Sequence, residues 1–345
     1  MAHDLTVRKS GQVEMAYVGE KPWHGLGEQL QPGASIETWL KAAGMDWKVQ
    51  RAKVRYATRA AEGGSMTAYK LDDLAVWDDY HVLLRSDTKA PVGMVSDQFK
   101  IVQPREVLEF FRDLVEVAGF TLETAGTLRG GSKFWALASI QAEDRVVGND
   151  LVKGRLMLAT ACDGSMKTTA KNVAVRVVCA NTLAIAMGEK GSPEVAVSHR
   201  SKFDAKVVKA QLGVALDSFH RFILEARTLA ARRVTLIESQ RFVGGLVDGK
   251  VNAAQSSEKI VEAMNSIVEM RSYQRILELF QGSGRGANLP GAKGTAWGLL
   301  NAVTEYVDHD RPTRGDASNR LNSAWFGSGN DLKTRAYDAA LALVA

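Results

Sequence analysis

The chain has 345 residues, of which 46% are hydrophobic and 24% are charged, and its formal net charge is +5. These values are typical of a soluble globular protein and exclude a disordered chain or a disulfide-rich scaffold. The length allows one large domain or two ordinary ones, with enough core to need no disulfide or metal for stability. Few cysteines, a polar N-terminus and no apolar run of bilayer length predict a cytoplasmic protein without membrane contact.

Residues 22–27, Pro-Trp-His-Gly-Leu-Gly, combine an aromatic ring, an imidazole and two glycines. Because glycine lets the backbone approach a ligand closely, His24 is a candidate functional residue. A glycine turn beside a buried tryptophan is the alternative interpretation. Further on, Ser35 is the predicted N-cap of a short helix that Gly44 ends.

Strands are predicted between residues 47 and 102, where basic and apolar residues alternate at 47–56. The aspartates at 72–79 indicate a solvated loop. The turn chemistry of residues 86–89 then predicts a hairpin.

Apolar residues recur at spacings of three and four from Pro104 to Ala118, which predicts a helix. Two strands are expected next, on either side of the glycine-rich turn 128–133. This turn places Arg129 and Lys133 beside two aromatic residues, although it lacks the spacing of a phosphate-binding fingerprint.

Residues 158–182 indicate a strand, a turn and a second strand, with Asp163-Gly164 as the turn dipeptide. Arg176 lies inside the apolar second strand, and a buried cation without a partner is costly. We therefore expect Arg176 to have a partner or to lie on an open face, and we expect Lys167 and Lys171 to share that face.

Positive charge is concentrated around this hairpin. Residues 151–210 contain ten Lys and Arg against four Asp and Glu, a surplus of six that exceeds the net charge of the whole chain. A clustered positive field favours a polyanionic partner, most commonly nucleic acid. A solvated charged face is the alternative.

The second half of the chain has mainly helical periodicity. After a short helix at 181–187 and a strand at 194–198, the pattern becomes helical from residue 203 onward. The predicted helices span residues 207–223, 238–246, 257–280, 295–307 and 332–344.

The glycine-rich loop 281–294 carries two cations and no acids. It is either a phosphate-binding loop at a helix N-terminus or a mobile linker. The charged turn after the next helix contains Asp308 and His309.

Several phrases resemble the phage/plasmid-like proteins of an uncharacterised family with a domain of unknown function, found in phages, prophages and plasmids. The resemblance covers nearly the whole chain and implies a mobile-element context, but no catalytic residues. The phrases that carry it are residues 22–27, 85–88, 124–126 with 134–136, 160–165, 175–182 and 308–309.

The leading functional hypothesis is a DNA-binding protein, with single-stranded DNA annealing in recombination or replication as its specific form. Cations on strands beside aromatic rings can hold phosphates while bases stack. We expect no cofactor and no metal, and a homo-oligomer is compatible with such a role. The candidate nucleic-acid contacts are Arg129, Lys133, Lys167, Lys171 and Arg176.

Two other functional classes remain open. One is a protein-binding module that counters a host defence system, and the other is an uncharacterised enzyme. His24, Asp163, Asp308 and His309 are the titratable candidates for such roles, but the chain lacks the usual metal and nucleophile spacings. Cys162 is not expected to be an activated thiol, because the neighbouring Asp163 disfavours the thiolate.

The predicted fold is α+β. An antiparallel β-sheet with packed helices is expected in the N-terminal two thirds, followed by a mostly helical C-terminal part. The division predicted from sequence is 1–202 and 203–345, with a shared core as the alternative to two separate units.

Overall fold

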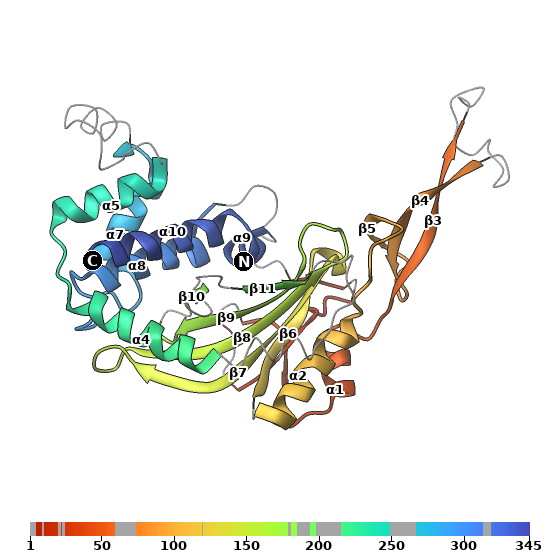
Figure 1. The fold of residues 1–345 in the computed structure, drawn as a ribbon, viewed down its shortest axis with the longest axis horizontal. Coiled ribbons are helices and arrows are strands. Elements are labelled where there is room, and N and C mark those ends of the chain that lie inside the picture. The colour runs from red at the N-terminus through yellow and green to blue at the C-terminus, as the bar shows by residue number, and fades with distance from the viewer. Residues whose placement is uncertain are drawn as a thin grey trace.

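The structure is a computed structural model that describes residues 5–8, 10–19, 22, 25–58, 74–118, 120–178, 181–184, 194–197, 215–248, 267–312 and 319–345. It confirms the predicted α+β class, with sheets in the N-terminal two thirds and helices in the C-terminal part. Figure 1 shows a curved central sheet, helices at both of its ends, and a narrow ribbon that projects from one side.

The larger sheet has eight strands in the order β10-β9-β8-β7-β6-β1-β2, and β11 also pairs with β9. All neighbours are antiparallel except β1 and β2, which run parallel. The strands are β1 (Met15–Val18), β2 (Glu28–Leu30), β6 (Thr121–Leu128), β7 (Lys133–Arg145), β8 (Leu151–Ala161), β9 (Thr168–Arg176), β10 (Asn181–Ala184) and β11 (Glu194–Val197).

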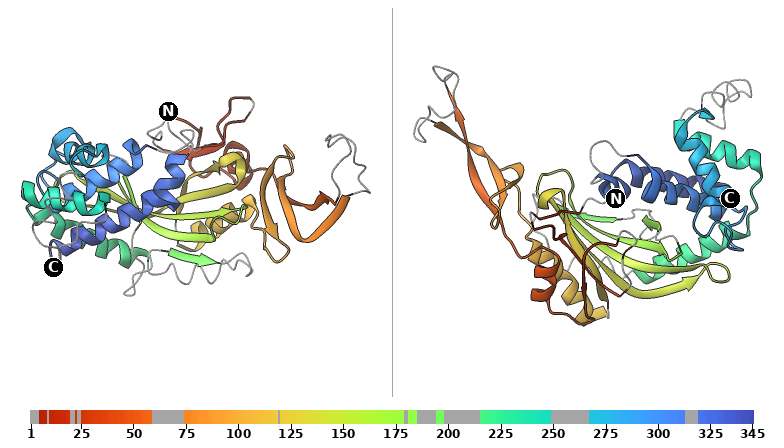
Figure 2. Two further views of the ribbon diagram at one scale, coloured as in Figure 1. Left: turned by 90° about the horizontal axis from the view of Figure 1, so that it is seen from above. Right: turned by 180° about the vertical axis from the view of Figure 1, so that it is seen from behind.

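The smaller sheet contains β3 (Val49–Ala57), β4 (Leu74–Arg85) and β5 (Pro91–Ser96), in that order. Beyond the short β5, only β3 and β4 continue, so the sheet narrows to a two-stranded ribbon. Figure 2 shows that this ribbon stands away from the rest of the protein in both further views.

Helices cover the larger sheet and form the C-terminal layer. In the N-terminal part, Ser35 caps α1 by accepting a hydrogen bond from the Thr38 backbone N–H, as predicted. The helices are α1 (Ile36–Ala42), α2 (Pro104–Ala118), α4 (Ala215–Ala231), α5 (Leu236–Asp248), α7 (Arg271–Glu278), α8 (Ala296–Glu305), α9 (Asn319–Phe326) and α10 (Ser328–Ala342). Two π-helical turns, η4 (Leu279–Ser283) and η5 (Tyr306–Asp310), extend α7 and α8.

The two faces of the larger sheet have different neighbours. On one face, Phe134, Leu156 and Ala174 belong to the main hydrophobic cluster, which also contains residues of α1, α2, α4 and α8. The opposite face carries a small second cluster around Trp135, against which Phe326 of α9 packs. The main cluster therefore includes side chains from both sides of residue 202.

Two predicted elements differ from the structure, and two predicted helices are described only in part. Residues 181–184 form strand β10 instead of a helix, because they pair with the outer edge of β9. The ribbon strand β4 begins at Leu74, so Asp78 and Asp79 lie in a strand and not in a loop. The helix expected at 207–223 is described only from Ala215, and much of the one expected at 257–280 lies outside the described residues.

Candidate nucleic-acid interface

Arg176 is buried in an ion pair, so of the two alternatives that the sequence left open, a partner or an open face, the structure shows the partner. Its Nε donates to Asp150 Oδ1 at 2.7 Å and its Nη2 donates to Asp150 Oδ2 at 2.9 Å. Trp297 Nε1 donates to the same carboxylate at 2.9 Å, and Gly286 accepts a further bond from Arg176. These groups are buried, so Arg176 joins β9 to α8 and the loop before it instead of contacting phosphate.

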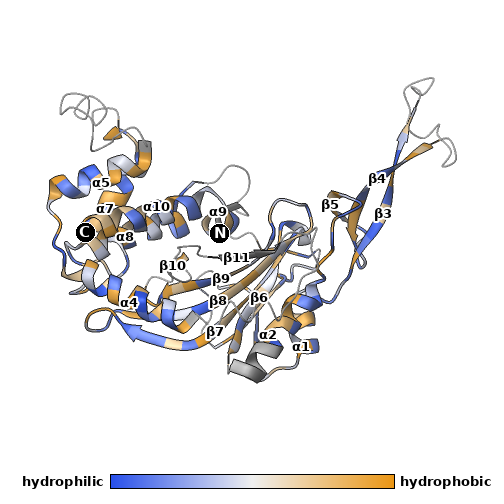
Figure 3. Cartoon of the chain, viewed as in Figure 1, coloured by the Kyte–Doolittle hydropathy of each residue, from blue (hydrophilic) through white to orange (hydrophobic). Residues whose placement is uncertain are grey.

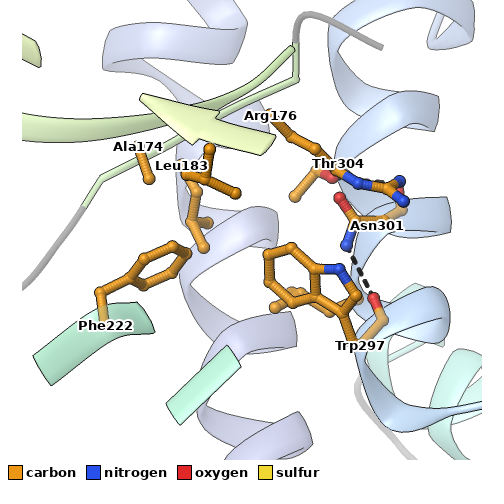
Figure 4. Close-up of a pocket in the computed structure, with 9 residues that line it drawn as sticks. Ala174, Arg176, Leu183, Phe222, Trp297, Asn301 and Thr304 are labelled. Atoms are coloured by element: carbon orange, nitrogen blue, oxygen red, sulfur yellow. Dashed lines mark hydrogen bonds between the residues drawn. The ribbon is translucent and has the colours of Figure 1, made fainter. Parts of the chain in front are cut away.

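Figure 4 shows a small cavity beside this pair, between β9, β10, α4 and α8. Its volume of about 10 Å³ leaves room for one water molecule and not for a substrate. Arg176, Asn301 and Thr304 are the polar residues around it, and Asn301 Nδ2 already donates to the Trp297 carbonyl. The cavity therefore belongs to the packing of the sheet against α8.

Lys133 and Lys171 share one face of the sheet, but that face is covered. Arg176 lies on the opposite face of β9 from Lys171, so the predicted shared face of these two cations is not found. Leu137 pairs with Met157 and Met157 pairs with Lys171, so strand alternation places Lys133, Trp135 and Lys171 on the same side. Lys133 and Lys171 are only 5% and 3% exposed.

Helix α9 covers these two lysines. Lys133 Nζ donates to Asn322 Oδ1 at 2.7 Å, and Lys171 Nζ donates to the Trp325 carbonyl. The ring of Phe326 lies 5.8 Å from the first ammonium and 5.0 Å from the second. The sequence did not indicate this helix as an element.

The other two candidate cations are exposed. Lys167 precedes β9 in the turn after β8, and Arg129 lies in the turn before β7 with a positive φ of 51°. Of the five candidate cations, Arg176 is thus buried in an ion pair, and α9 covers two lysines. The remaining two, Arg129 and Lys167, are exposed in turns.

The titratable candidates have local roles. Asp163 Oδ1 accepts from the Ser165 N–H within the β8–β9 turn. Burial and the Asp163 charge raise the pKa of the Cys162 thiol to about 12, which agrees with the expected inert cysteine. Asp308 Oδ1 accepts from Lys333 Nζ at 2.7 Å in a nearly dry environment, and His309 lies beside it in η5. His24 lies outside the described residues.

The glycine-rich loop 281–294 fits neither of its predicted roles. Glu305 accepts from the Arg285 N–H through both carboxylate oxygens, so the loop is fixed to α8 and is not a linker. Thr295 caps α8, and a Cβ on Gly298 would lie 1.9 Å from the Ala292 carbonyl oxygen. The loop therefore closes over the helix N-terminus and leaves no open place there for a phosphate.

The ribbon presents accessible cations. Arg51, Lys53 and Arg55 alternate along β3 and lie on one face of the smaller sheet, Arg55 in its two-stranded part, and all three are exposed. Figure 3 shows that β3 is largely hydrophilic, in contrast to the central strands of the larger sheet. The alternation at 47–56 is visible in the sequence, but nothing in the sequence indicates that this strand projects.

Aromatic side chains occupy the opposite face of the ribbon. Val54 pairs with Trp77 and Ala75 pairs with Tyr56, so both rings share the face that Val54 occupies. Tyr56 is 50% exposed and Trp77 is 42% exposed. The ring centroids of Trp77 and Tyr80 are 4.3 Å apart.

An ionic cluster fixes the base of the ribbon to the larger sheet. Arg85, the last residue of β4, donates to Glu14 at 2.7 and 2.9 Å and to Asp87 at 2.8 and 3.0 Å. Its guanidinium lies 4.4 Å from the Trp47 ring centroid. The hydrogen bonds and charge of Arg85 hold the pKa of the Asp87 carboxyl below its usual value.

The geometry thus defines an α+β protein with an exposed cationic and aromatic ribbon and a covered basic sheet face. Among the residues that the structure describes, no three His, Cys, Asp or Glu side chains group closely enough to hold a metal ion. No helix in the described part of the chain is long and apolar enough to cross a membrane.

The chain belongs to the family described as "Domain of unknown function (DUF932)", whose model matches residues 91–325. The matched range includes the strands that bear Lys133 and Lys171 and nearly all of α9, whereas β3 and β4 precede it. No curated protein and no solved structure matches the chain.

Proposed function

We propose that the protein binds single-stranded nucleic acid, and that the β3–β4 ribbon is its principal contact surface. The observation that carries the proposal is the pairing of a cationic face, Arg51, Lys53 and Arg55, with exposed Tyr56 and Trp77 on the other face. Long cationic side chains follow a phosphate backbone, while aromatic rings stack on bases of any sequence.

β3 is an edge strand, so ligand can approach both its backbone and its side chains. Charged residues on edge strands also prevent pairing with other chains, which alone would explain the cations. It does not explain the exposed rings, because such protection disfavours large apolar side chains on an edge. Binding accounts for both features together.

The carboxylates near the ribbon cations form only weak ion pairs with them. Lys53 Nζ lies 3.9 Å from Asp78, and Arg51 lies 3.6 Å from the Asp97 carboxylate and also donates to the Asp97 and Phe99 carbonyls. Both acids are well exposed, and exposed ion pairs contribute only about 0–1 kcal/mol. Phosphates can therefore displace these carboxylates at little cost.

Anisotropy titrations of a fluorescent oligo(dT) at several salt concentrations test the proposal. We expect Trp77→Ala and Tyr56→Ala each to weaken binding by about 1–3 kcal/mol, the usual value of one stacked base. Replacing Lys53 and Arg55 with Gln should reduce the salt slope by about 0.7 for each phosphate that the variant no longer neutralises.

Arg105→Gln is the matched control, because Arg105 is an exposed cation on α2, away from the ribbon. This variant should bind like the wild type. Absence of binding by the wild-type protein at low salt would contradict the proposal, as would equal effects of the ribbon and control substitutions.

The finer form of the proposal is annealing of complementary strands during recombination or replication of a phage or plasmid. It is supported by the sequence resemblance and by a binding surface that does not depend on base identity. Accelerated duplex formation from two complementary strands, abolished in Trp77→Ala, is the expected result. Binding without acceleration would limit the protein to strand protection.

A further inference from the structure

We propose that α9 is an internal cover over a second polyanion-binding surface, and that nucleic acid displaces it. The inference rests on the proposed function and adds its regulation. The surface is the side of β7, β8 and β9 that carries Lys133, Trp135, Arg155 and Lys171, here called the lysine face. Figure 1 shows α9 lying apart from the ribbon, near the sheet and joined directly to α10.

The lysine face is a continuous set of donors on three adjacent strands. Lys133 and Trp135 lie on β7, Arg155 on β8 and Lys171 on β9. Leu137 pairs with Met157 and Met157 with Lys171, while Ser139 pairs with Arg155, so strand alternation places all four donors on one side. A sheet surface of cations around an aromatic ring has the chemistry of a single-strand binding platform.

Helix α9 makes contacts that a bound nucleic acid strand could replace. Asn322 Oδ1 and the Trp325 carbonyl accept from the two lysines, and the Phe326 ring lies against both ammonium groups. Phosphate oxygens are stronger acceptors for ammonium groups than amide or carbonyl oxygens. Bases can take the place of the aromatic contacts, since the Trp325 ring packs edge-on against Trp135 with centroids 4.9 Å apart.

Two further donors on the same face indicate a ligand. Trp135 Nε1 and Arg155 Nη1 are both buried, and neither atom has a hydrogen-bond partner among the residues that the structure describes, although Arg155 Nε donates to Glu123. Trp135 is 2% exposed, so its indole N–H is removed from water without compensation. Buried donors of this kind are rare and costly, and oxygen acceptors from a ligand would satisfy them.

The cover rests on limited apolar support. Among the described residues, the cluster beneath it contains five buried side chains, and of α9 Ala324 belongs to the main core, against which Trp325 also packs. Asn322, Trp325 and Phe326 are only partly buried. A helix with few buried apolar contacts opens at a lower free energy than the core elements. Helix α9 should therefore separate from the lysine face at a lower free-energy cost than the core elements.

The double variant Asn322→Ala with Phe326→Ala tests the cover in the full-length chain, using the same oligo(dT) titration. We expect several-fold tighter binding and a salt slope steeper by about 1.4, because two more lysines become able to contact phosphates. Adding Lys133→Gln and Lys171→Gln should abolish this gain. Ile237→Ala, which shortens an exposed side chain on α5, is the control and should change nothing.

The outcomes separate this inference from the proposed function. If ribbon substitutions weaken binding while the α9 variant matches the wild type, the cover is refuted and the proposed function stands. If neither the wild type nor the α9 variant binds at low salt, both are refuted. If the α9 variant binds more tightly and its gain needs both lysines, the cover is supported.

Hydrogen exchange on the wild-type protein supplies a second measurement that needs no variant. On binding oligo(dT), amides of residues 319–326 should lose protection while those of β7 to β9 keep or gain it. Unchanged or increased protection in α9 on binding would overturn the inference, even if the α9 variant proves unstable.

Discussion

Asp150 is the residue on which the junction between the sheet and α8 depends. Its carboxylate is fully buried and accepts from Arg176 Nε and Nη2 and from Trp297 Nε1. Removing one partner of a buried ion pair leaves the other charge without compensation, which costs far more than the intact pair contributes.

Asp150→Ala should therefore destabilise the protein by about 3–5 kcal/mol, because it leaves the Arg176 guanidinium buried without its counter-charge. Urea denaturation measures the effect. Asp144→Ala is the comparison, since Asp144 pairs with Arg227 on the surface, and the expected cost is below about 1 kcal/mol. Similar losses of stability for both variants would show that the buried ion pair contributes no more to stability than the exposed one.

The sequence predicted the need for a partner at Arg176 but not its identity. A cation inside an apolar strand requires either an open face or a counter-charge, and that requirement can be read locally. Asp150 lies on the loop before β8, and only the register of β8 on β9 brings the two together. For the same reason the sequence could not show that Lys133 and Lys171 are covered, since their cover comes from residues 322–326.

Helix α5 shows how local signals fix an element. Thr235 precedes the helix and accepts from the Glu238 N–H, while Glu238 accepts from the Thr235 N–H in return. This reciprocal arrangement is a capping box, which satisfies two donors at the helix N-terminus. The backbone hydrogen bond from Thr235, helped by the Arg232 guanidinium, lowers the pKa of Glu238 to about 2.

The depressed pKa of Glu238 predicts a pH dependence. A carboxyl whose pKa is lower in the folded state contributes stability above its unfolded pKa of 4.5, and this contribution disappears as the pH falls towards 2. The wild-type protein should lose stability as the pH falls from 4.5 to 2, and Glu238→Gln should lack the share of this loss that Glu238 causes. Thermal unfolding at several pH values measures the difference. An unchanged pH profile would refute the role of the capping box.

Elements with strong local signals were predicted well, and those fixed by pairing or context were not. Pro104 to Ala118 is α2 with the predicted bounds, because an apolar stripe and an N-terminal proline are both local. Residues 181–184 and 74–79 form strands only because β9 and β3 offer edges for pairing. Helix α9 has eight residues and gains its position from contacts with the distant lysine face.

At the scale of the whole molecule, sheet and C-terminal helices have a common core. Phe134 and Leu156 of the sheet lie in one cluster with Phe222 of α4 and Trp297 of α8. A fragment that ended at residue 202 would expose this sheet face to water. The apolar core therefore continues across residue 202, where the sequence predicted a division.

Calorimetry should accordingly show one cooperative unfolding transition, with the calorimetric and van't Hoff enthalpies in agreement. A fragment of residues 1–202 should be insoluble or lack cooperative unfolding, because it is without the helices whose Phe222 and Trp297 lie against Val152 and Ala174 of the sheet. Two separate transitions, together with a well-folded fragment, would instead establish the division at residue 202.

Arg85 gives the ribbon a fixed pivot. Its guanidinium is held by Glu14 and stacked on Trp47, and it also donates to the Gly130 carbonyl in the turn that starts β7. Gly131 in that turn has a φ of 95°, and a Cβ there would meet both Trp47 and the guanidinium. The base of the ribbon is thus joined through Arg85 to the turn before Lys133, so a change in the angle between the ribbon and the larger sheet would have to break or rearrange this ionic cluster.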